Sequence, residues 1–370
     1  MSQFEILPIV EKYYPIKIFV KSLVWIFCKV ARFIGLIHRA DGTKVVILSL
    51  NKIGDSIFTI QAIKKIIEFH KHKPISLICF PETKSIFQMT FPSVDILTIP
   101  HKSFWKKRIA NSEAKKILRA TKPEIIYDLT GAITSATLIA FSSAKKIIGM
   151  NLEYFKPLYN YFALIRTKPH LIDSYLDVVR KVISVEDDYN YEFPFIVSET
   201  NKILIHPHAG WKAKEWGIEK YLELGRRLSS RYEVEFITEA GSLSERIKKD
   251  IQENFNLIEA KSVEALMENI KKCALLIGND SGPIYIANML GKPTFTIYGP
   301  TNPEYSKPFG KHHTQIHQKV GCSPINTQYC FTDAGRKCPD YICMRNLTVD
   351  VVYNKVIDFL DKEKIQKHII

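Results

Sequence analysis

The chain has 370 residues, longer than one ordinary α/β domain, and this length predicts about two domains of roughly 150 residues each. Apolar residues make up 46% of the sequence, which is enough for two packed cores and excludes a disordered protein. Its 52 Lys and Arg against 38 Asp and Glu give a formal net charge of +14, which favours a polyanionic partner: nucleic acid, an anionic membrane or a phosphorylated ligand.

The N-terminal region is predicted to lack a cleavable secretory signal. Its early apolar residues follow Glu5, Glu11 and Lys12, and no small-residue cleavage site comes after them. We therefore expect the seven cysteines to be in a reducing cytoplasm. The longest uncharged apolar run near the N-terminus, residues 22–28, is far shorter than the roughly 20 residues that cross a bilayer, so no transmembrane helix is predicted.

Residues 16–39 are predicted to form an amphipathic helix. At about 100° per residue, one sector collects the cationic side chains Lys17, Lys21, Lys29, Arg32 and Arg39. The opposite face carries large apolar side chains: Phe19, Val20, Leu23, Ile26, Phe27, Val30, Phe33, Ile34 and Ile37. Such a helix can lie among the headgroups of an anionic leaflet. The alternative is a surface helix that packs on the protein's own core and leaves its Lys and Arg solvated. We favour the membrane, because the segment precedes the first predicted strand and is not needed to complete it.

From residue 44 onward, short apolar strands alternate with amphipathic helices, the pattern of a parallel sheet covered on both faces. The first half has predicted strands at 44–50, 75–80, 95–99, 124–129 and 146–150, with helices at 57–69, 105–120 and 175–183. The second half has predicted strands at 202–206, 233–238, 274–278 and 294–298, with helices at 218–230, 243–253, 262–271, 283–290 and 349–361.

The irregular stretch 186–195 is the predicted interdomain linker. The fold class is therefore α/β, with two Rossmann-like domains that face a central cleft and hold ligands at the carboxyl ends of their strands. The predicted boundaries are a membrane-associating segment at 1–41, an N-terminal domain at 42–190, a C-terminal domain at 191–348 and a last helical segment at 349–370.

Residues 278–283, Gly-Asn-Asp-Ser-Gly-Pro, lie between a predicted buried strand and a helix. A turn of small residues at this place lets backbone N–H groups and the positive end of the helix approach a phosphate. Ser281 adds a hydroxyl donor, and Asp280 is suited to hold a ribose hydroxyl or to orient the loop. The alternative is a plain N-cap, because Asp and Ser are favoured there in any protein.

Residues 205–216 form a second strand-to-helix loop, which carries two Lys, two His and two Trp. Lys214 is suited to neutralise a diphosphate leaving group, whose developing charge is the main electrostatic problem in cleaving a nucleotide-sugar bond. Taken alone, this lysine would more often be a solvated surface residue. The turn at 278–283 in the same half favours a ligand.

The N-terminal counterpart is the loop 51–56, which contains Asn51, Lys52, Gly54, Asp55 and Ser56. It is neither GxGxxG nor a Walker motif, so a dinucleotide or ATP cradle is not supported. A carboxylate on a glycine turn that faces a cleft can accept the proton of an attacking hydroxyl. The alternative is that Asp55 caps the helix at 57–69.

Together these loops resemble those of the heptosyltransferase family, glycosyltransferase family 9, which are inverting GT-B enzymes that build the inner core of lipopolysaccharide. The resemblance rests on Gly54-Asp55-Ser56, on residues 206–216, on Asn279-Asp280-Ser281-Gly282-Pro283 and on the later runs at 291–294 and 298–303. It spans about residues 44 to 360 and leaves the N-terminal helix outside.

The resemblance implies that Asp55 is the general base, flanked on the acceptor side by Asn51, Lys52, Gly54 and Ser56. It implies that the donor diphosphate binds to Lys214, Asp280, Ser281 and Gly282, near His208 and Gly210, while Glu245 contacts the nucleoside. The implied donor is ADP-heptose, used without a metal ion or cofactor, and the implied acceptor is lipopolysaccharide core or another lipid-linked glycan. This chain departs from the family at Tyr285, where a His is frequent, and at Ala209-Gly210, where a pair like Thr-Thr is frequent.

Four cysteines, Cys322, Cys330, Cys338 and Cys343, fall close together near the C-terminus. Structural zinc sites are usually built on tight Cys pairs, and only the last of these spacings fits that pattern. We therefore expect packed or free thiols in a long loop rather than zinc. His312, His313 and His317 are predicted to be surface residues.

The predicted reaction is a single in-line displacement by an enzyme that works in the cytoplasm, peripheral on the inner face of the inner membrane. One alternative is an epimerase or hydrolase of nucleotide sugars with the same fold, which would need no acceptor. Another is a nucleic-acid-binding protein, but the basic residues are dispersed and no RRM, KH, helix-turn-helix or zinc-finger signature is present. No nucleic-acid partner is therefore expected.

Overall fold

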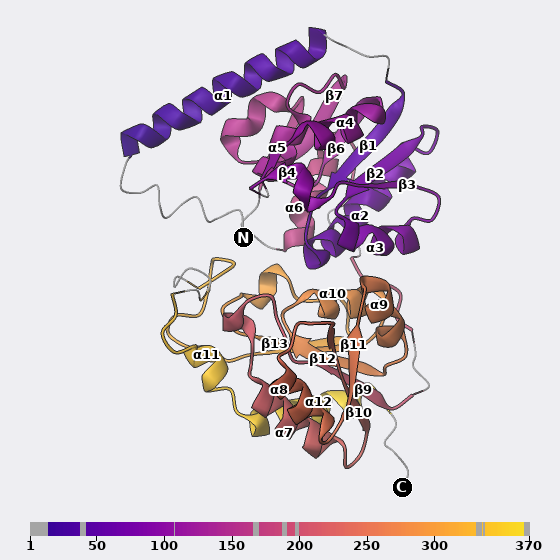
Figure 1. The fold of residues 1–370 in the computed structure, drawn as a ribbon, viewed down its shortest axis with the longest axis vertical. Coiled ribbons are helices and arrows are strands. Elements are labelled where there is room, and N and C mark those ends of the chain that lie inside the picture. Colours follow the sequence, from indigo (N-terminus) through magenta and orange to yellow (C-terminus); the bar gives the residue numbers. More distant parts are fainter. Residues whose placement is uncertain are drawn as a thin grey trace. The chain divides into compact units, whose positions relative to one another are not determined.

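The computed structural model describes residues 14–37, 42–106, 108–165, 170–186, 191–196, 200–330, 335 and 337–365. The chain divides into two compact units. Unit 1 comprises residues 1–166 and 171–189, and unit 2 comprises residues 167–170 and 190–370. Each unit contains one six-stranded sheet (Figure 1). None of the helices in the described part combines the length and the apolarity that crossing a bilayer requires.

The sheet of unit 1 is entirely parallel and has the strand order β3-β2-β1-β6-β7-β8. Its strands are β1 (Lys44–Ser49), β2 (Ile75–Cys79), β3 (Asp95–Thr98), β6 (Pro123–Asp128), β7 (Lys146–Asn151) and β8 (Tyr161–Leu164). Numbered along the sheet, this is the 3-2-1-4-5-6 order of a doubly wound dinucleotide-type fold, in which the direction of winding changes between the first and fourth strands. In unit 1 that switch point lies between β1 and β6.

The helices of unit 1 cover both faces of this sheet. They are α2 (Ile53–Phe69), α3 (Lys84–Thr90), α4 (Ser112–Ala120), α5 (Ile133–Ile139) and α6 (Leu171–Arg180). Helix α2 packs on α6, whereas α4 and α5 share a second core with buried strand residues such as Val46 and Ile126. The helix predicted at 105–120 is wrong in its first part, where β4 (Phe104–Trp105) pairs with β5 (Ile109–Ala110) before Asn111 caps α4.

Unit 2 repeats the same architecture, with a parallel sheet in the order β11-β10-β9-β12-β13-β14. Its strands are β9 (Lys202–His206), β10 (Glu233–Glu239), β11 (Asn256–Ala260), β12 (Leu275–Asn279), β13 (Thr294–Tyr298) and β14 (His313–His317). The switch point of this sheet lies between β9 and β12.

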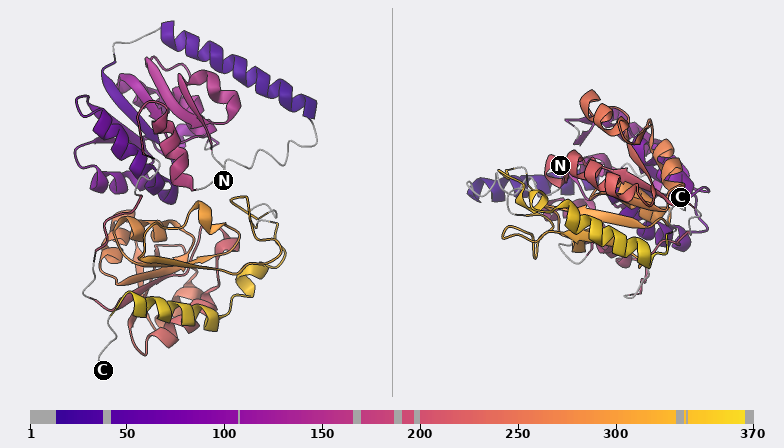
Figure 2. Two further views of the ribbon diagram at one scale, coloured as in Figure 1. Left: turned by 180° about the vertical axis from the view of Figure 1, so that it is seen from behind. Right: turned by 90° about the horizontal axis from the view of Figure 1, so that it is seen from below.

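The helices of unit 2 are α7 (Ile218–Leu228), α8 (Glu245–Gln252), α9 (Val263–Lys271), α10 (Gly282–Met289), α11 (Ile342–Arg345) and α12 (Val349–Lys362). Helix α12 packs on α7, and its buried Val352, Val356 and Leu360 join the same core as Tyr221 of α7. Helices α9 and α10 pack together on the other face of the sheet (Figures 1 and 2).

The histidines predicted at the surface lie in or beside β14 and have partners. His313 is bonded to Asn288 Nδ2 (2.7 Å) and Thr294 Oγ1 (3.0 Å), and burial lowers the pKa of its imidazole to about 4. His317 Nε2 donates to the Gly299 carbonyl oxygen (3.0 Å), while His312 stacks on Phe195 and pairs with Glu363. All three histidines are half-buried, so the surface prediction holds only in part, and their partners were not predicted.

Helix α1 (Tyr14–Ile37) packs along unit 1 against η5 (Glu153–Leu158), as Figure 1 shows. Its buried side is narrow and consists of Cys28, Ala31, Arg32 and Gly35. A Cβ on Gly35 would lie 2.3 Å from the Ser142 carbonyl oxygen, so only glycine permits this approach. Small residues therefore bring the helix backbone directly onto unit 1.

Arg32 fixes α1 on the rest of unit 1 by polar contacts. It is therefore available neither to lipid headgroups nor to solvent, as the two interpretations of the cationic sector required. Its guanidinium donates to the carbonyl oxygens of Ser142 (3.2 Å) and Lys145 (3.1 Å) and to Asn160 Oδ1 (2.9 Å). Burial lowers the pKa of Arg32 to about 10. Lys21 and Lys29 are exposed as predicted, whereas Arg39 and the side chain of Lys17 lie outside the described residues.

The apolar face of α1 is turned to solvent. All nine side chains predicted for that face are exposed, from 37% for Ile34 to 65% for Phe33. The alternative of a helix packed on the protein's own core is correct for Cys28 and Ala31, which join the core of unit 1, but it does not account for the exposed apolar face. Unit 1 instead contacts the opposite side of the helix, which carries small residues and Arg32.

Candidate active site

The two predicted donor loops of unit 2 follow adjacent strands. Strands β9 and β12 pair directly, with Ile205 opposite Ile277 and His206 opposite Gly278. The loop after β9 and the turn after β12 therefore begin at the same edge of the sheet, on the two sides of the switch point. This is the place where doubly wound sheets bind their ligands.

Lys214 and Asp280 join these two loops. Lys214 ends the short helix η6 (Lys212–Lys214), and its Nζ lies 2.5 Å from Asp280 Oδ2 and 3.3 Å from the Asp280 carbonyl oxygen. The Lys214 side chain is 16% exposed and that of Asp280 3%. An ion pair buried to this extent is maintained only by good geometry and further hydrogen bonds.

Two aromatic residues complete the surroundings of this ion pair. The Tyr285 hydroxyl donates to the other carboxylate oxygen of Asp280, and the Lys214 ammonium lies 4.8 Å from the centre of the Trp211 ring. Burial raises the pKa of Tyr285 well above its usual range, and the charge of Asp280 adds to this effect. Tyr285 therefore remains a neutral donor. Its hydrogen bond orients Asp280.

The turn after β12 leads into α10 without a side-chain cap. Ser281 is the N-cap residue, but its hydroxyl donates backward to the Asn279 carbonyl oxygen (3.2 Å) and makes no cap bond. The alternative of a plain side-chain cap is therefore wrong. An anion can instead be stabilised by the partial positive charge of the helix start at Gly282.

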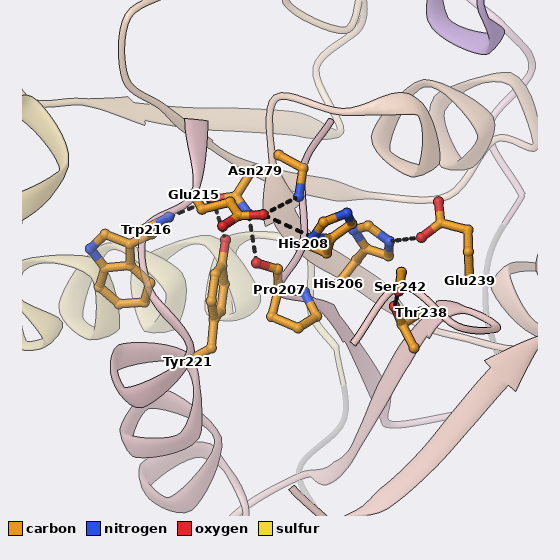
Figure 3. A network of polar contacts seen from close by, with 11 residues as sticks. His206, Pro207, His208, Glu215, Trp216, Tyr221, Thr238, Glu239, Ser242 and Asn279 are labelled. Atoms are coloured by element: carbon orange, nitrogen blue, oxygen red, sulfur yellow. Dashed lines mark hydrogen bonds and ion pairs between the residues drawn. The ribbon is translucent and has the colours of Figure 1, made fainter. Parts of the chain in front are cut away.

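Asn279 ties the loop after β9 to strand β12 (Figure 3). Its Oδ1 accepts from the Trp216 backbone N–H (3.1 Å) and the Tyr221 hydroxyl (3.0 Å), and its Nδ2 donates to the Pro207 carbonyl oxygen (2.9 Å). Asn279 is fully buried. The sequence contained Asn279 as part of a motif but gave no sign of this role, because all three partners are at least 58 residues away along the chain.

Two His–Glu pairs lie beside this network (Figure 3). His208 Nδ1 is 2.8 Å from Glu215 Oε1, and the hydrogen bond between them raises the pKa of His208. His206 Nε2 is 3.1 Å from Glu239 Oε2. Burial acts to raise the pKa of Glu239. The hydrogen bond from His206 and the positive charge of His206 act in the other direction and lower that pKa to about 2. The second pair, at the ends of β9 and β10, was not predicted.

Two other predicted donor residues lie outside these contacts. Gly210 is exposed, and a Cβ built on it would have no neighbour within 4 Å. Glu245 lies in the first turn of α8 with its side chain 89% exposed and its carboxylate 2.9 Å from Lys248 Nζ. The structure thus places Lys214, Asp280, Ser281 and His208 on the two joined loops and Glu245 on a separate helix.

In unit 1, the predicted acceptor loop leaves β1 and enters α2 earlier than expected. Helix α2 begins at Ile53 rather than at residue 57, and Lys52 is its N-cap residue. Gly54, Asp55 and Ser56 therefore form the first turn, so the alternative of Asp55 as the cap is wrong. The Ser56 backbone N–H donates to the Lys52 carbonyl oxygen (2.8 Å), which continues the helix through this point.

Asp55 is half-buried. Burial raises the pKa of Tyr175 in α6 well above its usual range, and the negative charge of Asp55 adds to this effect, which places the two side chains near each other. Asn51 holds the preceding loop, because its Nδ2 donates to the Leu129 carbonyl oxygen (3.1 Å). The carboxylate of Asp55 therefore stands at the carboxyl edge of the sheet beside its switch point.

A buried polar cluster that the sequence did not reveal lies at the end of β6. Asp128 is fully buried and accepts from the Tyr159 hydroxyl (2.7 Å) and the Thr130 backbone N–H (2.9 Å). Burial raises the pKa of Asp128, although these hydrogen bonds act against it. Asn151 Nδ2 also donates to the Tyr159 hydroxyl oxygen (3.0 Å). The cluster holds together the ends of β6 and β7.

Comparison with known proteins identifies the family. The model of glycosyltransferase family 9 (heptosyltransferase) matches residues 112–333, more than half of the chain. The chain belongs to glycosyltransferase family 9. It is therefore a glycosyltransferase, and the resemblance seen in its loops is confirmed.

Relatives of this family 9 enzyme cover most of its length. Lipooligosaccharide heptosyltransferase 2 of Campylobacter jejuni subsp. jejuni serotype O:6 is 24% identical over 82% of this chain and 95% of the relative. The glycosyl transferase family 9 structure from Veillonella parvula has a TM-score of 0.71 and 18% identity, over 88% of this chain and 99% of that one. The structure of E. coli heptosyltransferase WaaC with ADP-2-deoxy-2-fluoro heptose has a TM-score of 0.64 and 15% identity, over 85% of this chain and 99% of that one. These structures support the predicted GT-B fold.

Proposed function

We propose that this enzyme transfers a heptose from ADP-heptose to the core of a lipopolysaccharide with inversion at the anomeric carbon. The observation that carries the proposal is the buried Lys214–Asp280 pair beside the uncapped start of α10, at the switch point of the unit 2 sheet. Membership in family 9 and the heptosyltransferase relatives support the sugar and the acceptor.

The donor diphosphate is assigned to unit 2. When the bond between the anomeric carbon and the phosphate oxygen breaks, negative charge develops on the departing ADP. Lys214 supplies a positive charge whose position Asp280 fixes in advance, and the start of α10 at Gly282 supplies backbone dipoles. Such fixed groups stabilise the leaving group without a metal ion in the proposed mechanism. His208, Ser281 and Glu245 are assigned to the remaining contacts with the donor.

The acceptor hydroxyl is assigned to Asp55 in unit 1. Its carboxylate takes the proton as the acceptor oxygen forms a bond to the anomeric carbon, and the bond to ADP breaks on the opposite side. Gly54 has no side chain that would shield this carboxylate. Asn51 and Lys52 precede it in the loop, and Ser56 follows it in the first turn of α2. The arrangement supports one displacement step with a single base.

We assign α1 to the surface of an anionic membrane, so that the enzyme is peripheral on the inner face of the inner membrane, where a lipid-linked acceptor is exposed. Moving one large apolar side chain from water into an apolar medium contributes about 1.5–3 kcal/mol. A Lys near an anionic surface contributes about 1 kcal/mol. The nine exposed apolar side chains therefore outweigh Lys21 and Lys29, and binding should persist in part at high salt.

The transfer reaction is tested with purified full-length enzyme. Thermal shifts with ADP-, GDP-, UDP- and CMP-linked sugars should single out an ADP-sugar, and product should form only when truncated lipopolysaccharide is added. Product from the nucleotide sugar alone would instead indicate an epimerase or hydrolase. Binding of the donor without transfer to any lipopolysaccharide would overturn the proposed acceptor.

The membrane assignment is tested by vesicle flotation with anionic and neutral phospholipids. A variant with Phe19→Glu, Ile26→Glu and Phe33→Glu should lose binding to anionic vesicles, while the control Phe69→Glu, at an equally exposed site on α2, should keep it. These substitutions are preferable to deletion of the segment, because Cys28 and Ala31 belong to the core of unit 1. Unchanged flotation of the triple variant would show that another surface binds lipid.

A further inference from the structure

The segment between β14 and α12, residues 318–348, holds four of the seven cysteines. In its described part, α11 is a single helical turn. A loop of this length without regular structure is uncommon in a compact domain and usually has a specific role or an added constraint. This segment lies outside the proposed transfer chemistry, so its composition needs a separate explanation.

Cys322, Cys330, Cys338 and Cys343 all line one small cavity of about 10 Å³. That volume corresponds to about one water molecule or one ion. The other lining residues carry no charge, and they include Ala213, Gly299, Pro300 and Gly335. The sequence predicted packed or free thiols along a loop and did not predict that all four would meet at one point.

The local geometry favours a ligand role for Cys338. The Tyr341 backbone N–H donates to Cys338 Sγ (3.2 Å), and Tyr341 has a positive φ of 49°, which is uncommon for a residue other than glycine. Backbone donors to cysteine sulfur stabilise thiolates that bind metals and tune the site. The backbone after Cys338 thus turns so that the Tyr341 N–H points at the Cys338 sulfur.

Cys343 is buried. Burial raises the pKa of Cys343 to about 11, and Cys322, Cys330 and Cys338 add to this effect. A bound divalent metal ion reverses this effect, because it stabilises coordinated thiolates directly.

We propose that Cys322, Cys330, Cys338 and Cys343 together bind one thiophilic metal ion in tetrahedral S₄ coordination. Zn²⁺ and Fe²⁺ both suit four thiolates. Binding converts four thiols to thiolates and releases four protons to solvent. In the described residues no three His, Cys, Asp or Glu side chains form a ligand set. The proposal therefore requires the four sulfurs to move together when the ion binds.

The ion would fasten this segment to the loop that carries Lys214. Ala213, which precedes Lys214, and Gly299 and Pro300, which follow β13, line the same cavity. The Cys330 backbone N–H donates to the Pro300 carbonyl oxygen (2.9 Å). The metal therefore has a structural role, and its loss should weaken donor binding without removing a catalytic group.

Metal content and cobalt spectra of the full-length protein test this proposal. Enzyme purified without chelator should contain one zinc or iron ion per chain, and elemental analysis distinguishes the two. Cobalt added to the metal-free protein should give the thiolate charge-transfer and tetrahedral d–d bands. Cys330→Ser and Cys343→Ser should lose the bound ion and these bands, whereas Cys273→Ser, a buried cysteine outside the cavity, should keep both.

Thiol labelling of the wild type keeps the test independent of how the variants fold. Zinc should protect these four cysteines from alkylation, and a chelator should expose them together. Equal labelling with and without zinc, or a disulfide within the group in protein kept anaerobic, would overturn the proposal. Either result together with normal heptosyl transfer would leave the proposed function intact.

Discussion

Asp55 of unit 1 and Asp280 of unit 2 occupy comparable places in the two halves of the chain. Each follows a strand beside the switch point of its sheet and lies at the start of a helix. Their neighbours differ. Asp280 is almost fully buried between Lys214 and Tyr285, whereas Asp55 is half-buried and lies near Tyr175. The fold places a carboxylate at the start of a helix in each half. In the proposed mechanism, the neighbouring side chains decide whether this carboxylate fixes a cation or receives a proton.

The largest effect is expected at Asp55. Asp55→Asn should lower kcat by about 10²–10⁴-fold, because the amide cannot accept the proton of the acceptor hydroxyl. Donor affinity should remain near the wild-type value, since the proposed donor groups belong to unit 2. Steady-state kinetics and donor titration measure the two quantities. A wild-type kcat in the Asp55→Asn variant would show that Asp55 is not the base. The proposed difference in role between Asp55 and Asp280 would then be lost.

The second effect concerns the partner of Asp280. Lys214→Ala should weaken donor binding about 10- to 100-fold, the range expected for a lost hydrogen bond to a charged group. It should also lower the free energy of unfolding by about 3 kcal/mol, because the buried carboxylate of Asp280 is left without its cation. Calorimetric titration and urea unfolding measure the two effects.

A double variant separates these two roles of Lys214. Lys214→Met combined with Asp280→Asn leaves no buried charge, so it should recover most of the lost stability. Its donor affinity should stay low, because the positive charge is still absent. Recovery of affinity together with stability would mean that Lys214 acts on the fold alone.

A smaller effect is expected at Tyr285. Tyr285→Phe removes the hydroxyl that donates to Asp280 and should cost about 1 kcal/mol of stability. Donor affinity should fall by less than it does in Lys214→Ala, because the cation remains in place. Thermal unfolding and the same titration provide the comparison. A loss of affinity as large as that of Lys214→Ala would make Tyr285 a direct contact of the donor.

The smallest effect is the pH dependence at His208. Its pKa is raised in the folded protein by the bond to Glu215, so its contribution to stability is complete below about pH 6.5 and is lost as the pH rises through the raised value. The pair is about one-third exposed, which limits the contribution to less than about 1 kcal/mol. Urea unfolding from pH 5.5 to 8.5 should show wild type and His208→Gln converging as the pH rises. A constant difference would exclude this titration.

The sequence predicted the site loops well because their signals are local. Apolar strands followed by small polar turns place residues 51–56, 207–216 and 279–283 at the carboxyl ends of strands, and the structure agrees. The start of α2 was missed because Lys52 is not a usual capping residue and Gly54 is a weak helix former. Strands β11 and β14 were missed because they carry polar residues at a sheet edge or within a short run.

Contacts between distant parts of the chain could not be predicted in this way. The Lys214–Asp280 pair joins residues 66 positions apart, and the contacts of Arg32 span 110 to 128 positions. The sequence predicted the apolar face of α1, all of which is exposed. It did not predict that Arg32 would dock, because this depends on Ser142, Lys145 and Asn160. The meeting of the four cysteines depends in the same way on how a long loop folds back.

The anchoring of α1 by Arg32 has a consequence for how the helix responds to change. A helix that is held only by apolar side chains can rotate about its axis with little loss of free energy, because apolar contacts are not directional. The Arg32 guanidinium donates to three oxygen atoms, and these directional hydrogen bonds allow only one rotation of the helix about its axis. After replacement of Arg32 by Leu, α1 should therefore rotate about its own axis while it remains packed on the rest of unit 1. The direction of its exposed apolar face would then vary.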